Sequence, residues 1–284
     1  MDLVIHHSLG STSSKYNSFS YFLNKTLVSQ KTAKATKTIF SLQPSSTSTT
    51  YSSQLTLESE GTFTLDSKNK QTLVTSGTIS TLNIRQKDGF LGLNGFDLLT
   101  ATNADIDVID LIVAGYSNKS AVGLSKKFLQ KSDSITGSQS DDHLAGYRGN
   151  DTLTGGHGAD ILVGGAGKDT FVYNSIDDSG VFTNYSSSGS VRVGGDTFYE
   201  SEYNDVIIDF RSGKDKIDLQ NIKGITKKSL KITSTSYKLQ GKKSTLDLGR
   251  PYALWIDKDH DNVPEMVISF ASTLNPLSMD DILI

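Results

Sequence analysis

A nine-residue period between residues 128 and 172 constrains this chain more than any other feature of its sequence. An aspartate recurs in one register, at Asp133, Asp142, Asp151, Asp160 and Asp169. Two residues after each aspartate stands an apolar side chain, at Ile135, Leu144, Leu153, Leu162 and Phe171. Glycine opens most of the units, at Gly137, Gly146, Gly155 and Gly164. Three coincident registers indicate one structural unit repeated along the chain.

Each unit divides into a turn and a short strand. In the unit 155–163, Gly155–Asp160 forms the turn, where glycines permit positive φ angles and close backbone approach. Ile161–Val163 forms a strand whose central side chain points inward. Successive units then run in opposite directions, so two units complete one coil. The pattern predicts a parallel β-roll of two stacked sheets, because ordinary Gly-Asp hairpin turns would not hold an apolar residue in a nine-residue register.

The turns on one edge of such a roll stack two units apart, which brings aspartates and backbone carbonyls of neighbouring coils together. We expect Asp133 to pair with Asp151, Asp142 with Asp160, and Asp151 with Asp169. Without a cation, each edge would hold repelling carboxylates and unpaired carbonyls. A hard cation with several oxygen ligands removes both costs, and Ca²⁺ tolerates irregular geometry that Mg²⁺ does not. The pattern therefore predicts Ca²⁺ as the cofactor.

The candidate metal ligands are the repeat aspartates and the turn residues whose carbonyls line the same edges. The carboxylate candidates are Asp133, Asp142, Asp151, Asp160 and Asp169. The turn candidates are Gly146, Arg148, Gly149, Gly155, His157, Gly158, Gly164, Ala166 and Gly167.

The repeat resembles the RTX (repeats-in-toxin) nonapeptide Gly-Gly-x-Gly-x-Asp-x-apolar-x, a calcium-binding repeat. The units 155–163 and 164–172 match every fixed position, and Tyr147 replaces the second glycine of the unit before them. The unit at 137 has serines at two glycine positions, and the unit at 128 keeps only its aspartate and its apolar residue. We therefore expect two calcium ions rather than three. The resemblance implies a secreted, extracellular protein.

Residues 174–284 resemble the part of serralysin-type C-terminal domains that follows the roll. The resemblance rests on the segments 205–210 and 213–219. It implies a β-sandwich-like part after the roll, and an Asp205 that helps to close the last calcium site. The final Asp281–Ile284 resembles the uncleaved signal read by type I secretion machinery, which we expect as a partner because residues 1–7 lack the pattern of a signal peptide.

The composition excludes several classes of function. The chain has no cysteine, so disulfides, cysteine-ligated zinc and thiol catalysis are excluded. A net charge of -3 gives no reason to expect nucleic acid, and no apolar run is long enough for a transmembrane helix. Residues 1–54 are rich in serine and threonine and predict a loosely ordered leader. Alternating apolar residues punctuated by glycines predict a β-rich domain of short strands over 55–127, including a strand over 104–114.

No familiar catalytic motif precedes the roll. The zinc-protease pattern His-Glu-x-x-His is absent, and residues 115–119 fail the Gly-x-Ser-x-Gly elbow at the last position. Glu58 and Glu60 would share one strand face, an arrangement typical of a solvated surface. Two hypotheses stay open. The missing motifs favour a non-enzymatic region that binds an extracellular ligand or surface. The alternative is a small secreted hydrolase or lyase, and a cleft with converging carboxylates would support it.

A second acidic motif lies near the end of the chain. Asp257, Asp259 and Asp261 alternate before Glu265, as oxygen ligands do in a calcium loop. The EF-hand spacing fails, because Glu265 comes too early and Asn262 replaces the glycine. The motif also resembles the acidic turn before the last strand of serralysin-like domains. A metal loop and a simple hairpin both stay open.

Overall fold

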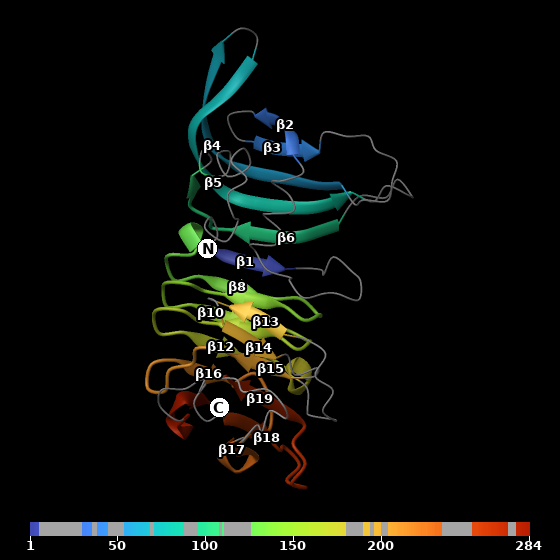
Figure 1. The fold of residues 1–284 in the computed structure, drawn as a ribbon, viewed down its shortest axis with the longest axis vertical. Coiled ribbons are helices and arrows are strands. Elements are labelled where there is room, and N and C mark those ends of the chain that lie inside the picture. The colour runs from blue at the N-terminus through green and yellow to red at the C-terminus, as the bar shows by residue number, and fades with distance from the viewer. Residues whose placement is uncertain are drawn as a thin grey trace. The chain divides into compact units, whose positions relative to one another are not determined.

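The computed structural model describes residues 1–5, 30–35, 39–44, 54–68, 71–87, 96–107, 110, 126–179, 190–193, 196–199, 204–234, 252–271 and 277–284. These residues belong to two compact units, one up to Gln130 and one from Lys131 onward. β-Strands make up most of the regular structure of each unit (Figure 1). Within the described ranges, no helix has the length and apolar character that crossing a membrane requires.

The first unit is built on an antiparallel sheet of order β2-β3-β4-β5-β6-β1, and β7 pairs with β5. Its strands are β1 (Asp2–Ile5), β2 (Gln30–Ala35), β3 (Ile39–Pro44), β4 (Gln54–Lys68), β5 (Gln71–Lys87), β6 (Phe96–Thr102) and β7 (Ile106–Asp107). Three of these strands, β1 to β3, lie in the segment predicted as a leader, and each pairs with a neighbour in the sheet. Of the strand expected over 104–114, β7 covers two residues, and 108, 109 and 111–114 lie outside the described residues.

Strands β4 and β5 are longer than the short strands that their glycines predict. Gly61 and Gly77 lie inside the paired strands, where Gly61 opposes Ile79 and Gly77 opposes Phe63. A Cβ at either glycine would overlap a backbone carbonyl of the opposite strand. The two glycines therefore permit close backbone approach within one long ladder and do not end a strand. Phe63 and Ile79 are buried beside them.

The second unit is a β-roll whose first sheet is parallel, with the order β8-β10-β12-β16-β20. Its strands are β8 (Ser134–Thr136), β10 (Thr152–Thr154), β12 (Thr170–Val172), β16 (Lys216–Asp218) and β20 (Ile282–Leu283). Leu153 pairs with Ile135 on one side and with Phe171 on the other, so neighbouring strands of the repeat lie two units apart in sequence. The sheet continues past the repeat, because Phe171 pairs with Ile217.

The second sheet of the roll has the order β9-β11-β15-β19-β18-β17. Its strands are β9 (His143–Ala145), β11 (Ile161–Val163), β15 (Asp205–Ile207), β17 (Leu230–Ser234), β18 (Tyr252–Ile256) and β19 (Met266–Phe270). The pairs from β9 to β19 are parallel, and the last two pairs are antiparallel. A hairpin of β13 (Ser190–Val193) and β14 (Asp196–Tyr199) and the 3₁₀ turns η1 (Ile176–Asp178), η2 (Lys227–Ser229) and η3 (Met279–Asp281) are also described.

The inward side chains of the repeat fill the space between the two sheets. The five positions that the register predicts as core are at most 2% exposed: Ile135, Leu144, Leu153, Leu162 and Phe171. The core continues through Phe210 and Phe270, whose ring centroids lie 5.3 Å apart, and Phe210 lies 6.1 Å from Phe171. The predicted all-β fold with a parallel β-roll is confirmed, and the part after the repeat extends both sheets of the roll.

Candidate metal centre

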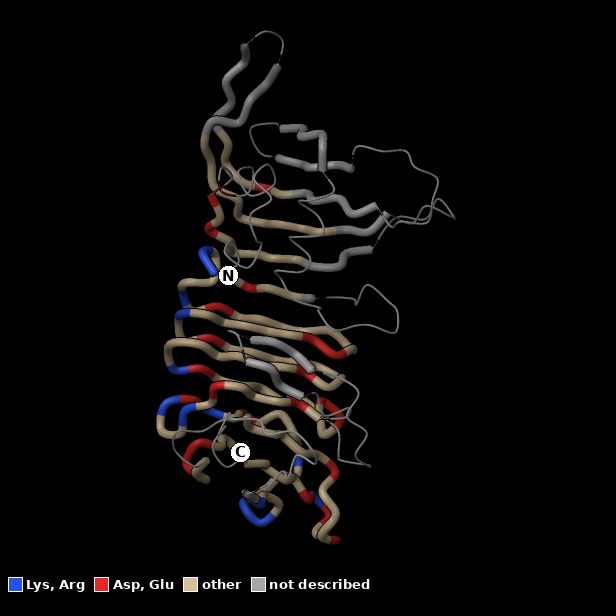
Figure 2. The backbone as a smooth tube through the Cα atoms, in the orientation of Figure 1, with Lys and Arg blue, Asp and Glu red and all other residues tan. Residues whose placement is uncertain are grey.

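The aspartates of the repeat form two hydrogen-bonded ladders, and acidic positions recur from coil to coil along the roll (Figure 2). Ladder A consists of Asp133, Asp151, Asp169 and Asp215. Ladder B consists of Asp142, Asp160 and Asp205. In ladder A, the backbone N–H of each aspartate donates to Oδ1 of the next over 2.8, 3.0 and 3.1 Å. In ladder B, the corresponding distances are 2.7 and 2.9 Å. Each carboxylate therefore holds the backbone of a neighbouring coil in register.

The ladder carboxylates are almost completely removed from water, since none of these residues is more than 4% exposed. Oδ2 of Asp151 and Asp160 is buried and accepts no hydrogen bond, and the buried Tyr173 hydroxyl lies beside the Asp205 carboxylate. Burial raises the pKa of Asp151 to about 7, and the charges of Asp169 and Asp133 add to this effect. Burial also raises the pKa of Asp160 and Asp205 well above the usual range. A bound cation beside these oxygens would remove the cost of holding them charged.

The turn glycines leave space that the carboxylates use. A Cβ at Gly155 would overlap Oδ2 of Asp160, and a Cβ at Gly146 would overlap Oδ2 of Asp151. The carbonyl oxygen of Gly164 lies 2.7 Å from the Cβ position at Gly146. A carboxylate and a carbonyl from adjacent coils therefore approach the same glycine. Carboxylate and backbone carbonyl oxygens are the ligands that Ca²⁺ prefers, so the residues present fit this ion.

The remaining turn candidates beside ladder A also meet across coils. Arg148 and Ala166 form an isolated parallel bridge. The Ala166 carbonyl accepts the N–H of Gly149 over 2.9 Å. A Cβ at Gly167 would overlap the Gly149 carbonyl, so the turns can stack this closely only with glycine at this position.

The candidates beside ladder B show the same close stacking. Gly158 has φ +129°, and a Cβ there would come within 2.7 Å of the Ser140 backbone one coil earlier. The His157 ring lies outside the ladder, with Nδ1 3.0 Å from the Asp177 carbonyl oxygen. The His157 imidazole therefore lies against η1.

The structure stacks the three aspartate pairs that the sequence predicts, and Asp205 follows Asp160 in ladder B. Asp215 was missed by the sequence analysis, although its signal is present. The spacing Gly213-x-Asp215-x-Ile217 repeats that of Gly167-x-Asp169-x-Phe171 in the last complete unit. A long interruption of the period hides the match. The cationic residue beside Asp215, Arg211, was missed for the same reason.

A scan against protein-family models finds four copies of the RTX calcium-binding nonapeptide repeat over residues 136–171. The chain carries RTX calcium-binding repeats. In these repeats Ca²⁺ has a structural role and no catalytic one, which agrees with ladders that lie between coils and are closed to solvent. The RTX match begins after Asp133, so the weakest unit of the period stands outside it.

Two solved structures are similar to this chain, both subunits of the mannuronan C5-epimerase of Azotobacter vinelandii. The solution structure of AlgE6R3 is 24% identical, with a TM-score of 0.32, and the match covers 54% of this chain and 78% of that chain. The solution structure of AlgE6R2 is 25% identical, with a TM-score of 0.32, and the match covers 54% of this chain and 88% of that chain. No curated protein matches the chain.

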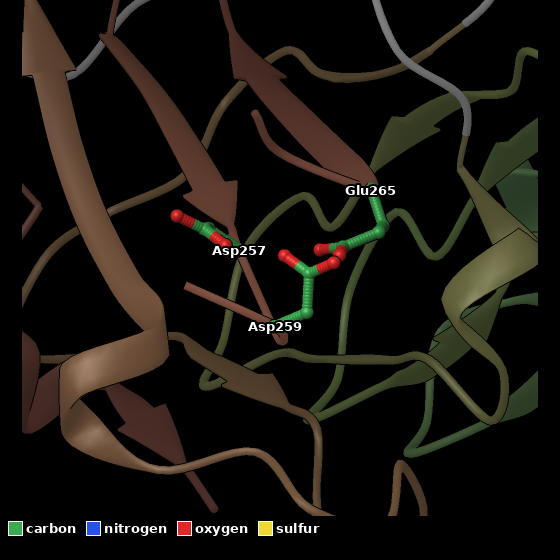
Figure 3. A group of neighbouring side chains, drawn as sticks. All are labelled: Asp257, Asp259 and Glu265. Atoms are coloured by element: carbon green, nitrogen blue, oxygen red, sulfur yellow. The ribbon is translucent and has the colours of Figure 1, made fainter. Parts of the chain in front are cut away.

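The acidic loop between β18 and β19 brings a second group of carboxylates together (Figure 3). Carboxylate oxygens of three residues lie within 4.8 Å of one another: Asp257, Asp259 and Glu265. Glu265 Oε2 accepts the N–H of Lys258 over 2.7 Å, and Asp257 Oδ2 accepts the N–H of Asn262 over 2.9 Å. These bonds hold the turn of a hairpin, whereas Oδ1 of Asp257 is buried without a hydrogen-bond partner.

Proposed function

We propose that this chain is a secreted calcium-binding protein whose roll folds when it meets extracellular calcium. The observation that carries the proposal is the pair of buried ladders, in which Oδ2 of Asp151 and of Asp160 has no hydrogen-bond partner. Calcium bound at these oxygens contributes its binding free energy to folding, because the unfolded chain has no preformed site. Extracellular calcium modules bind at about 10⁻⁴–10⁻³ M. At lower concentrations of free calcium, the carboxylates within each ladder repel one another, and the roll stays unfolded.

Export before folding is the second part of the proposal, with type I secretion machinery as the partner. In the folded chain, β20 pairs with β16, and Asp281 is 1% exposed. The Asp281 carboxylate accepts hydrogen bonds from Ser212 Oγ over 2.5 Å and from the Gly213 N–H over 2.8 Å. A receptor would therefore reach Asp281 and Ile282 only before the chain folds, which fits export of an unfolded chain at low calcium.

The first unit is proposed to bind an extracellular ligand or surface without catalysis. Exposed and buried side chains alternate along its long strands: Phe63 and Ile79 are buried, whereas Thr62, Thr78 and Ser80 are exposed. Thr62 and Thr78 are directly paired across β4 and β5. Neighbouring hydroxyls on a rigid sheet suit a ligand rich in hydrogen-bonding groups.

Circular dichroism during a calcium titration tests calcium-dependent folding. We expect a disordered signal for the roll in excess chelator, and a β signal that appears with calcium but not with equal Mg²⁺. Replacing both Asp160 and Asp169 with Ala should move the midpoint to higher calcium. A full β signal in excess chelator would overturn the proposal.

A further inference from the structure

We infer that the Arg211 guanidinium is a built-in cation that ends ladder A, in the position where a calcium ion would otherwise bridge Asp169 and Asp215. The inference rests on the proposed binding of calcium by the roll. The end of ladder A differs from the sites before it, because its cation is a side chain of the protein itself.

One nitrogen of Arg211 contacts the kinds of oxygen that a calcium ion takes. Nη2 donates to the Gly167 carbonyl over 2.7 Å. The same nitrogen lies 3.2 Å from Asp169 Oδ2 and 3.2 Å from Asp215 Oδ1. A turn carbonyl and two carboxylates of successive coils therefore converge on one positive charge. Hydrogen bonds between charged groups of this kind are about twice as strong as neutral ones.

The preceding step of ladder A has no such side chain. One coil earlier, Asp151 takes the place of Asp169, and its Oδ2 is buried without a hydrogen-bond partner. Asp169 Oδ2, in contrast, is paired with Arg211. In the sheet register, Lys216 pairs with Thr170, which aligns Arg211 with Gly165 of the repeat. At this position of the turn, the repeat has an uncharged glycine and the later coil has a positively charged arginine.

Arg211 is held in place by its own turn. Its backbone N–H donates to Asp215 Oδ2 over 2.7 Å, and Nε lies 3.2 Å from the same oxygen. The Asp215 N–H donates back to the Arg211 carbonyl over 2.9 Å. An arginine side chain stays protonated at ordinary pH, so the guanidinium keeps its charge. The cation is therefore present whether or not calcium is.

The test compares Arg211→Gln with Lys214→Gln, which removes the same charge from an exposed residue of the same turn. Bound calcium is counted by native mass spectrometry and equilibrium dialysis in the full chain. We expect Arg211→Gln to bind one ion more than the parent, and Lys214→Gln and Arg211→Lys to bind the parent number. At a calcium concentration that just suffices to fold the parent, Arg211→Gln should melt below Lys214→Gln, and saturating calcium should remove the difference.

An unchanged ion count in folded Arg211→Gln, with a loss of melting temperature that calcium does not reverse, would overturn the inference. If this variant does not fold, the parent decides the question through a crystal structure with bound calcium. An ion within about 2.3–2.6 Å of Asp169 Oδ2 and Asp215 Oδ1 would then refute the role of Arg211, and the guanidinium between them would support it. A parent that binds no calcium at all contradicts the proposed function instead, so the two failures are distinguishable.

Discussion

Asp142 and Asp160 are joined by a hydrogen bond that uses only half of the Asp160 carboxylate. Oδ1 of Asp160 accepts the Asp142 N–H over 2.7 Å, whereas Oδ2 is buried without a partner. The first oxygen aligns two coils, and the second is available to a cation. An asparagine keeps a carbonyl oxygen for the first role and lacks the charge for the second. Substitution can therefore separate the alignment of coils from the binding of calcium.

We expect Asp160→Asn to raise the calcium concentration at the folding midpoint by about tenfold or more, because contacts with a charged group contribute about 1.5–3 kcal/mol. A calcium titration followed by circular dichroism measures the midpoint. Asp280→Asn removes the same charge from an exposed residue of the same unit and should leave the midpoint unchanged. Equal midpoints for Asp160→Asn and the parent would exclude Asp160 as a ligand.

Gly155→Ala should damage the same site by sterics alone. The added Cβ would overlap Oδ2 of Asp160 and displace the carboxylate, at a cost of about 1–3 kcal/mol. Gly213→Ala is the matched variant, because nothing lies within 4 Å of its Cβ position and only its φ of +80° opposes the alanine. Urea unfolding and calcium titration of both variants separate the effects. Calcium affinity should fall for Gly155→Ala and stay unchanged for Gly213→Ala.

The roll is predictable from sequence because one register encodes three properties at once. Leu153 and Asp151 each occupy a fixed position in the nine-residue unit. Every copy of the first position therefore faces the core, and every copy of the second lies in a ladder. The 18-residue spacing between Asp133 and Asp151 then fixes which carboxylates meet. Local spacing therefore predicts tertiary contacts in this part of the chain.

The end of each ladder is not encoded in that spacing. Asp160 meets Asp205 at a separation of 45 residues, and Asp169 meets Asp215 at 46. No local period predicts the length of an insertion between two coils. In the sequence, Asp215 therefore matches the aspartate position of the repeat without being in register with it. Gly61 presents a related difficulty, because a glycine inside a long paired strand has the same sequence signal as one that ends a strand.

Leu153→Ala should destabilise the calcium-loaded roll by about 2–5 kcal/mol. Leu153 is 0% exposed and lies in the middle strand of three paired coils, so the lost side chain leaves a cavity. Urea unfolding at saturating calcium gives the free energy of unfolding. Val263→Ala, at a position that is 63% exposed, should change it by no more than about 0.5 kcal/mol. A similar small effect at Leu153 would mean that the space between the sheets is not tightly packed.

Asp281→Asn should lower stability in a way that depends on pH. Burial acts to raise the Asp281 pKa, but hydrogen bonds from Ser212 Oγ and from the N–H groups of Gly213 and Ser278 outweigh it, so the pKa is lowered. A carboxyl whose pKa is lower in the folded chain stabilises the fold above its unfolded value of about 4. This contribution is lost as the pH falls through the folded pKa.

Urea unfolding of Asp281→Asn and the parent at matched pH and calcium measures this contribution. The difference in free energy should be about 2 kcal/mol at pH 7, as expected for hydrogen bonds to a charged group. It should be equally large at about pH 5 and shrink only below about pH 4, because the unfolded carboxyl is ionised at both higher values. Asp280→Asn, beside it and exposed, should match the parent throughout. A parent that gains stability over Asp281→Asn as the pH falls from 7 to 5 would show that the folded Asp281 pKa is raised, and would rule out its hydrogen bonds as the dominant influence.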